Sequence, residues 1–161
     1  MSTRLFLSTL AAGLAVAGVT AGGAALASST RPSSAPSSAP SASGPVLENG
    51  TARYRAPSAT GAGSFTYSVD VRDDSAVRSL RVLPWPASSS LDPTRAELRS
   101  AEPATCRDAG SGVTRCTYRL KVTHREAAAV DKGTWYVSVL ATAEDGGTRF
   151  APRAATVDVR D

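Results

Sequence analysis

The feature that most constrains the fold of this chain is a two-residue alternation of apolar and polar side chains. It is clearest in SFTYSVDVR, residues 64–72, and it recurs in CTYRLKV, residues 116–122, and AATVDVR, residues 154–160. Successive side chains of a strand point to opposite faces of a sheet, so this period predicts strands with one buried face. The expected inward residues are Phe65, Tyr67, Val69, Val71, Cys116, Tyr118, Leu120, Val122, Ala155, Val157 and Val159.

Further strands are expected at residues 50–56, 79–85 and 134–143. The last of these is apolar on both of its faces, which indicates a strand covered on both sides. Asp145-Gly146-Gly147 is a hairpin signal before the returning strand. Short strands at regular spacing with turn signals between them favour an antiparallel sandwich.

Two short crossover helices are expected between the strands. Asp92 and Pro93 have the residue types of an N-cap and a first helical position. Thr123 and Glu126 form a capping-box pattern ahead of an alanine run, and Gly133 offers a stop. The predicted fold class is all-β: an immunoglobulin-like antiparallel β-sandwich with about seven strands and one or two such helices.

The segment DKGTWYVSV, residues 131–139, sharpens this prediction because it resembles the strand F pattern of immunoglobulin-like domains. Trp135 stands where that pattern has its corner tyrosine, and Val137 stands where it has a core cysteine. Residues 64–161 are also similar to a family of small secreted domains of unknown function from filamentous actinobacteria. The resembling pieces are VDVRDDSAVRSLRVLPWP, ATCRDAG, CTYRLKVTHREAAAVDKGTWYVSVLATAEDGG and APRAA. The resemblance implies secretion and a sandwich, and it implies no activity.

The chain divides into three regions. Residues 1–27 have an early Arg4, an apolar run and an Ala25-Leu26-Ala27 end, which predicts a secretory signal peptide; a membrane anchor is the alternative. Residues 28–45 are rich in Ser, Ala and Pro, which predicts a disordered linker. Residues 46–161 are long enough for one sandwich domain with one core. The expected location is secreted, outside the cell.

The two cysteines, Cys106 and Cys116, are the only ones in the chain. Their spacing matches neither a zinc motif nor a Cys-x-x-Cys redox motif, and exported cysteine pairs are usually disulfides. With Ser111 at the centre of a hairpin, Cys106 falls opposite Cys116 and Arg107 faces Arg115. The pair is therefore expected to be a disulfide between neighbouring strands.

Charge argues against a nucleic-acid partner. Without Arg4 the chain has 17 basic and 14 acidic residues, a net charge of +3. The basic residues are scattered along the sequence among acidic ones, with no stripe interleaved with aromatics, so no nucleic-acid partner is expected. After signal cleavage no membrane contact is expected either.

Catalysis is not expected, and no catalytic residue is assigned. His124 is the only histidine and falls in the first turn of a predicted helix, where a solvent-facing role is the usual one. No Gly-rich phosphate loop lies between a strand and a helix.

The turns carry acids that are candidates for a calcium site. In an immunoglobulin-like strand order three turns meet at one end, and their carboxylates could supply oxygen ligands. Acidic residues also form turns for local reasons, and that alternative stays open. Calcium is the one cofactor considered. The candidate ligands are Asp73, Asp74, Asp108, Glu144 and Asp145.

Trp85, between two prolines, is a candidate binding residue, with closure of the core as the alternative. The leading functional hypothesis is a secreted, non-catalytic binding module of unknown ligand, with a cell-envelope polymer or protein as the class of partner. The first alternative is a secreted protease inhibitor that presents either the loop between the cysteines or the segment 83–93. The second alternative is a calcium-binding sandwich domain.

Overall fold

The structure is a computed structural model that describes residues 44–161. The expected signal peptide and most of the expected linker lie outside these residues. Gly44 and Pro45, the last residues of that linker, are described, and Pro45 is buried beside the first strand. Within residues 44–161, neither helix is long and apolar enough to cross a membrane.

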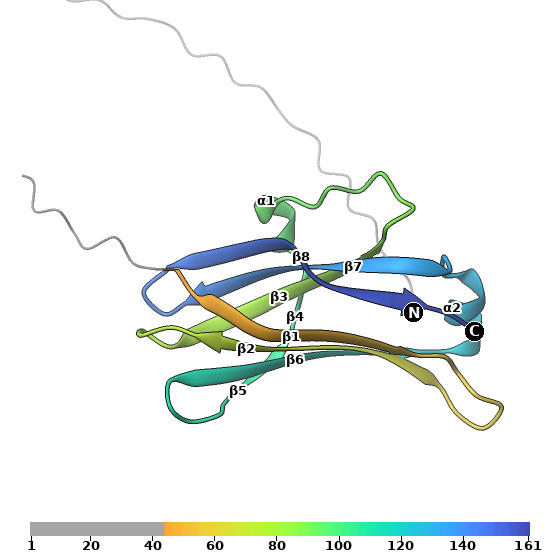
Figure 1. Ribbon diagram of the computed structural model, residues 1–161, viewed down its shortest axis with the longest axis horizontal. Helices are drawn as coiled ribbons and strands as arrows, with labels where there is room; N and C mark the ends of the chain where they lie inside the picture. The colour runs from red at the N-terminus through yellow and green to blue at the C-terminus, as the bar shows by residue number, and fades with distance from the viewer. Residues whose placement is uncertain (1–43) are drawn as a thin grey trace, which may run out of the picture. The chain divides into compact units, whose positions relative to one another are not determined.

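The described chain forms two four-stranded antiparallel sheets with two short helices (Figure 1). The first sheet has the order β1-β2-β6-β5 and the second has the order β4-β3-β7-β8. The elements are β1 (Val46–Arg55), β2 (Gly63–Arg72), β3 (Val77–Pro86), α1 (Arg95–Leu98), β4 (Glu102–Pro103), β5 (Thr105–Asp108), β6 (Val113–Val122), α2 (His124–Ala129), β7 (Gly133–Ala143) and β8 (Thr148–Val159).

The predicted sandwich is confirmed, with eight strands in place of about seven. β1, β2, β6 and β5 follow the order of strands A, B, E and D of an immunoglobulin domain, and β3, β7 and β8 follow the order of C, F and G. The unexpected strand, β4, has two residues, Glu102 and Pro103. So short an edge strand has no alternation for sequence reasoning to detect.

The core between the sheets comes from the alternating residues. Tyr67, Val71 and Leu80 have no exposed surface, and Phe65, Val69 and Val82 are almost as completely buried. Leu120 is the exception among the expected inward residues, with 43% of its surface exposed. β5 pairs with β6 only as far as Thr117, so no neighbouring strand covers Leu120 on that side.

Further buried side chains lie on the outer face of β3 and β7. Trp85, Leu98 and Leu140 are at most 3% exposed, although Trp85 and Leu140 point away from the main core. α1 contacts both β3 and β7, and its Leu98 is buried. The strand apolar on both faces is thus confirmed as covered on both sides: the main core lies on one and the β3–β4 connection on the other (Figure 1).

One helix start is confirmed and one is corrected. The capping box of α2 has Thr123 as its N-cap and Glu126 as its third residue. The prediction of Asp92 and Pro93 as the start of the other helix is wrong, because α1 is capped by Thr94. Thr94 and Glu97 bond each other's backbone N–H groups, which satisfies two free helix-end donors at once. The second helix, α2, ends at Ala129, sooner than expected. Gly133, the predicted helix stop, instead opens β7 with a φ of 111°.

Candidate functional site

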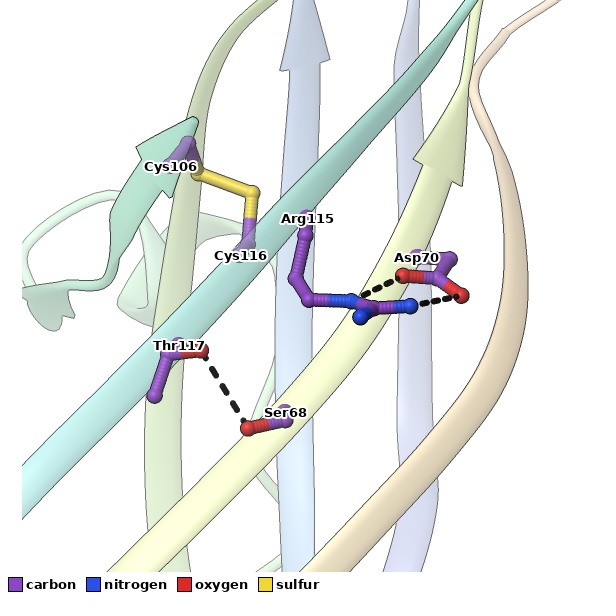
Figure 2. The surroundings of a disulfide bond; sticks show 6 residues. All are labelled: Ser68, Asp70, Cys106, Arg115, Cys116 and Thr117. Atoms are coloured by element: carbon purple, nitrogen blue, oxygen red, sulfur yellow. Dashed lines mark hydrogen bonds and ion pairs between the residues drawn. A yellow bond between two sulfur atoms is a disulfide. The ribbon is translucent and has the colours of Figure 1, made fainter. Parts of the chain in front are cut away.

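The disulfide between Cys106 and Cys116 joins neighbouring strands of the first sheet (Figure 2). The two residues are direct partners in the β5–β6 register, and Arg107 faces Arg115. The predicted pairing and hairpin register are both confirmed. Because β5 has four residues and is a sheet edge, the covalent bond holds in place a strand with few ladder hydrogen bonds of its own.

The hairpin closes through three residues with left-handed backbone. Gly110, Ser111 and Gly112 have φ values of 83°, 54° and 71°. Glycine adopts this region without the steric cost that a side chain brings, which explains the Gly-Ser-Gly sequence. Asp108 caps the turn by accepting a hydrogen bond of 2.8 Å from the backbone N–H of Gly110.

Beside the disulfide, Arg115 on β6 reaches across to Asp70 on β2 (Figure 2). Its Nε and one terminal nitrogen donate to the two carboxylate oxygens at 2.8 and 3.0 Å. Asn49, at a bulge in β1, donates to the same carboxylate at 3.1 Å. These donors, Arg115 before Asn49, lower the pKa of Asp70 from 3.8 to about 2. Asp70 therefore connects three strands of the sheet as a carboxylate.

The strand registers arrange the outward residues of this sheet in rows. Arg53, Thr66 and Arg119 are in register across β1, β2 and β6. Arg55, Ser64 and Lys121 form the adjacent row. The next row is neutral, and in it the hydroxyls of Ser68 and Thr117 form a 3.2 Å hydrogen bond (Figure 2). Basic residues far apart in the sequence thus meet on one surface, which we call the basic face.

The basic face carries far more positive than negative charge. Its seven basic residues are Arg53, Arg55, Arg72, Arg107, Arg115, Arg119 and Lys121. Its two acids are both paired: Glu48 with Arg72, and Asp70 with Arg115. Seven positive charges against two negative ones leave a net charge of +5 on this surface.

Five basic residues of this face make no ion pair within the described part of the chain. They are Arg53, Arg55, Arg107, Arg119 and Lys121, and all are exposed. The acid whose pKa responds to Lys121 is Glu126 on α2. Its carboxylate is held by the backbone N–H and hydroxyl of Thr123, which are the larger causes of its lowered pKa. The positive charge of the face is therefore left for solvent or a partner.

A shallow hollow of about 630 Å³ adjoins the basic face at the short strand β5. Arg107, Arg115 and Arg119 line it, and so do Thr117, Glu102 and Tyr118. Tyr118 donates to Glu102 at 2.9 Å, so this acid is also engaged. Burial, followed by the Glu102 contact, raises the pKa of Tyr118 to about 12, and its hydroxyl stays protonated.

The acidic turns come together in part. Carboxylate oxygens of Asp73 and Asp74, between β2 and β3, lie within 4.8 Å of one from Asp145, between β7 and β8. One oxygen of Asp73 accepts from the backbone and hydroxyl of Ser75, whereas the other is buried with no hydrogen-bond partner. Gly112 lines the same hollow as Asp73 and Asp74, so the three predicted turns do share one end.

Two of the five acids predicted as calcium ligands lie outside this cluster. Glu144 accepts from Arg78 at 3.1 Å, and Asp108 caps its own hairpin turn. Asp108 therefore has the local turn role that was the alternative to a metal site, whereas Glu144 is engaged by Arg78. Asp73, Asp74 and Asp145 remain as the acidic turn cluster.

The structure places the other candidate residues as follows. Trp85 is 3% exposed and donates from Nε1 to Ser138 at 2.9 Å, so its indole closes a core and is not displayed to a ligand. His124 is exposed at the start of α2, with Nε2 3.0 Å from the carbonyl oxygen of Ser58. Of the segment 83–93, Leu91 is 56% exposed, and the inhibitor hypothesis stays a prediction.

Sequence reasoning missed the basic face because its residues are spread from Arg53 to Lys121 and are separated by acids. The period-two pattern did place Arg119 and Lys121 outward on β6. What it lacked was the pairing of β1 and β6 on either side of β2, which brings their outward residues together. The bidentate bond between Asp70 and Arg115 depends on the same pairing.

Comparison with known proteins gives one match. No curated protein and no solved structure matches the sequence. A model described as "Family of unknown function (DUF5707)" matches residues 47–141, from β1 almost to the end of β7. These residues include the disulfide, the basic face and every strand except β8. The chain therefore belongs to the DUF5707 family.

Proposed function

We propose that this protein is a secreted, non-catalytic binding module that meets its partner through the basic face of the β1-β2-β6-β5 sheet. The observation that carries the proposal is the set of five exposed basic side chains without an ion pair among the described residues. Charge of one sign concentrated on a surface attracts and orients a partner of opposite sign.

The asymmetry between the two sheets supports this assignment. α1 contacts the second sheet, and Trp85 and Leu98 are buried on that side. The outer face of the first sheet carries polar and charged side chains in register. The disulfide and the Arg115–Asp70 pair fix the edge and centre of that face. A rigid surface loses little conformational entropy on binding.

Secretion and the absence of catalysis are parts of this proposal. The apolar N-terminal segment and the disulfide support an extracellular location. The single histidine is exposed and bonded to a loop carbonyl, which supports a role without acid–base chemistry. The immunoglobulin-like strand order is compatible with binding, although the fold alone assigns no function.

Retention on cell-envelope material tests the proposed function. We expect the full chain to be retained by isolated envelope fractions at low ionic strength and released by salt, because exposed charges are screened. Retention by no fraction would contradict the proposal. A cooperative thermal unfolding transition and an intact disulfide, measured on the same sample, show that the protein used was folded.

The acidic turn cluster supports a second candidate function, calcium binding. Three carboxylates from two turns lie within 4.8 Å of one another, and one Asp73 oxygen lacks a partner. Calcium takes six to eight oxygen ligands at about 2.3–2.6 Å, so backbone carbonyls and water would have to complete the set.

Calorimetric titration with calcium tests this candidate. The expected result is a saturable signal that Asp145→Asn abolishes and that Glu144→Gln, next to it in the same turn, leaves in place. The same titration with magnesium is the ion control, because that smaller cation requires near-octahedral geometry. Equal signals for the two variants would contradict a site at Asp73, Asp74 and Asp145.

A further inference from the structure

We infer that the partner of the basic face is a linear phosphodiester polymer without nucleobases, held mainly by Arg53, Arg55, Arg119 and Lys121. We call these residues the basic quartet. The inference rests on the proposed function and adds to it the chemical class of the ligand and the residues that bind it.

The strand register sets the spacing of the quartet. Arg53 and Arg55 are two residues apart on β1, and Arg119 and Lys121 are two residues apart on β6. Two residues of an antiparallel strand span about 6.8 Å, and β1 and β6 are separated by two strand spacings, about 10 Å in all. Four positive charges are thus held close together by the backbone.

Hydroxyl groups lie between the charges. Thr66 is in register with Arg53 on one side and Arg119 on the other, and Ser64 is in register with Arg55 and Lys121. An arginine can donate two hydrogen bonds to a phosphate, and a hydroxyl between two cations can donate a third. Each set of three residues in register therefore offers several hydrogen-bond donors to one phosphodiester. The two adjacent sets could hold successive phosphodiesters of one chain.

No member of the quartet is held in an ion pair within the described residues, and Glu126, the acid near Lys121, is bonded to Thr123. Like charges held at this spacing repel one another, and an anion between them removes the repulsion. The acids of the basic face, Glu48 and Asp70, are bound to Arg72 and Arg115 and lie in other rows.

The shape and composition of the surface select among polyanions. The outward positions of β1, β2 and β6 carry no Trp, Tyr or Phe, so the described face has no platform on which nucleobases could stack. The quartet lies on an open sheet face, which accepts a thin chain without enclosing it. A polymer whose charges are joined by small neutral units fits this surface better than a nucleic acid does.

Titration of the full chain with synthetic poly(glycerol phosphate) tests the inference. We expect binding at low salt that weakens as salt is added, because counterions are released when cations neutralise a polyanion. The variant R53E/R119E should bind at least about tenfold more weakly, since it replaces two attractions with two repulsions. The melting temperature of each variant should stay close to that of the wild type, because the changed side chains are exposed.

The matched control is R99E/R149E, which makes the same change in net charge. Arg99 and Arg149 are exposed and make no ion pair among the described residues, and neither belongs to the first sheet. We expect this variant to bind within about threefold of the wild type, because the effect of distant charge is screened. Equal losses in the two variants would overturn the placement of the ligand on the basic quartet.

Two further polymers test the chemical class of the ligand, and retention on envelope fractions separates this inference from the proposed function. Binding of polyglutamate or of an oligothymidylate at least as tightly as poly(glycerol phosphate) would overturn the phosphodiester polymer without bases. Retention on envelope fractions without any binding of poly(glycerol phosphate) would overturn the inference and leave the binding module standing. Loss of both would overturn the two together.

Discussion

At the scale of single residues, Asp70 has surroundings that its sequence context does not predict. It occupies an outward position of β2 among polar neighbours, yet it is 7% exposed and bonded to Arg115 and Asn49. Donors that favour the charged form lower its pKa to about 2. Its contribution to stability therefore depends on pH.

We predict that Asp70→Asn reduces the acid sensitivity of the protein. Because the folded-state pKa lies below the ordinary value of 3.8, the stabilisation is complete above that value and is lost as the pH falls towards 2. The melting temperature of the wild type should thus drop more between pH 5 and pH 2 than that of the variant. Asp158→Asn, in an exposed pair with Arg160, is the control and should follow the wild type.

A second prediction concerns Ser138, which has no exposed surface and accepts a hydrogen bond from Trp85. Ser138→Ala leaves the indole N–H buried without an acceptor, and we expect it to lower the free energy of unfolding by about 1–3 kcal/mol. Denaturant unfolding followed by fluorescence measures the change. Ser90→Ala, at an exposed serine in the β3–β4 connection, should have almost no effect, and equal effects would argue against the bond.

At the scale of elements, β5 depends on its covalent link. It has four residues, one strand neighbour and three exposed positions, so packing alone offers it little stabilisation. Its place matters to the candidate site because Arg107 and the hollow at its side belong to this strand. α2 is similarly small and relies on its capping box.

We predict that removing the disulfide destabilises the protein by roughly 3 kcal/mol, the loop-closure entropy of a short loop. Melting of the wild type with and without reductant, and of C106S/C116S, measures this loss. Binding through the basic quartet should survive at temperatures where the variant is folded, because β1, β2 and the C-terminal half of β6 pair without β5. A melting temperature that reductant leaves unchanged would rule out the stabilising role.

The capping box of α2 gives a second prediction at this scale. Thr123→Ala removes the hydroxyl that accepts from the backbone N–H of Glu126, and we expect it to cost about 0.5–2 kcal/mol of stability. Thr123→Ser keeps the acceptor and should be close to the wild type. Urea unfolding of the two variants distinguishes the cap from a simple effect of side-chain size.

At the scale of the whole molecule, the two sheets share one core and differ on their outer faces. One outer face carries the β3–β4 connection with its buried Leu98 and the buried Trp85 of β3, and the other is the basic face. The net charge of the chain is small. The electrostatic potential at its surface therefore depends mainly on how the charges are distributed.

A ligand on the basic face should stabilise the entire domain, because the face is built on strands that also form the core. With poly(glycerol phosphate) sites at about 100 times the dissociation constant, the expected gain is about 2.7 kcal/mol. Thermal melts at increasing polymer concentration should show a rising midpoint for the wild type and a constant one for R53E/R119E. A rise of equal size in both proteins would place the ligand elsewhere.

The sequence by itself determined the elements that depend on local pattern. Alternation of apolar and polar residues identified the long strands and their buried faces, since the pleat repeats every two residues. Symmetry about Ser111 predicted the partners Cys106 and Cys116, and Thr123 with Glu126 predicted the start of α2. Each of these features is set by residues close together in the chain.

Only the tertiary structure decided which distant residues meet. It buried Trp85 beside Ser138, left Asp108 and Glu144 out of the acidic turn cluster, and aligned Arg53 with Arg119 across β2. The physical reason is that strand neighbours are chosen by the packing of the whole sandwich, in which β1 and β6 flank β2 although β6 lies far along the chain. Local periodicity fixes the face of each side chain, and the sheet order fixes its neighbours.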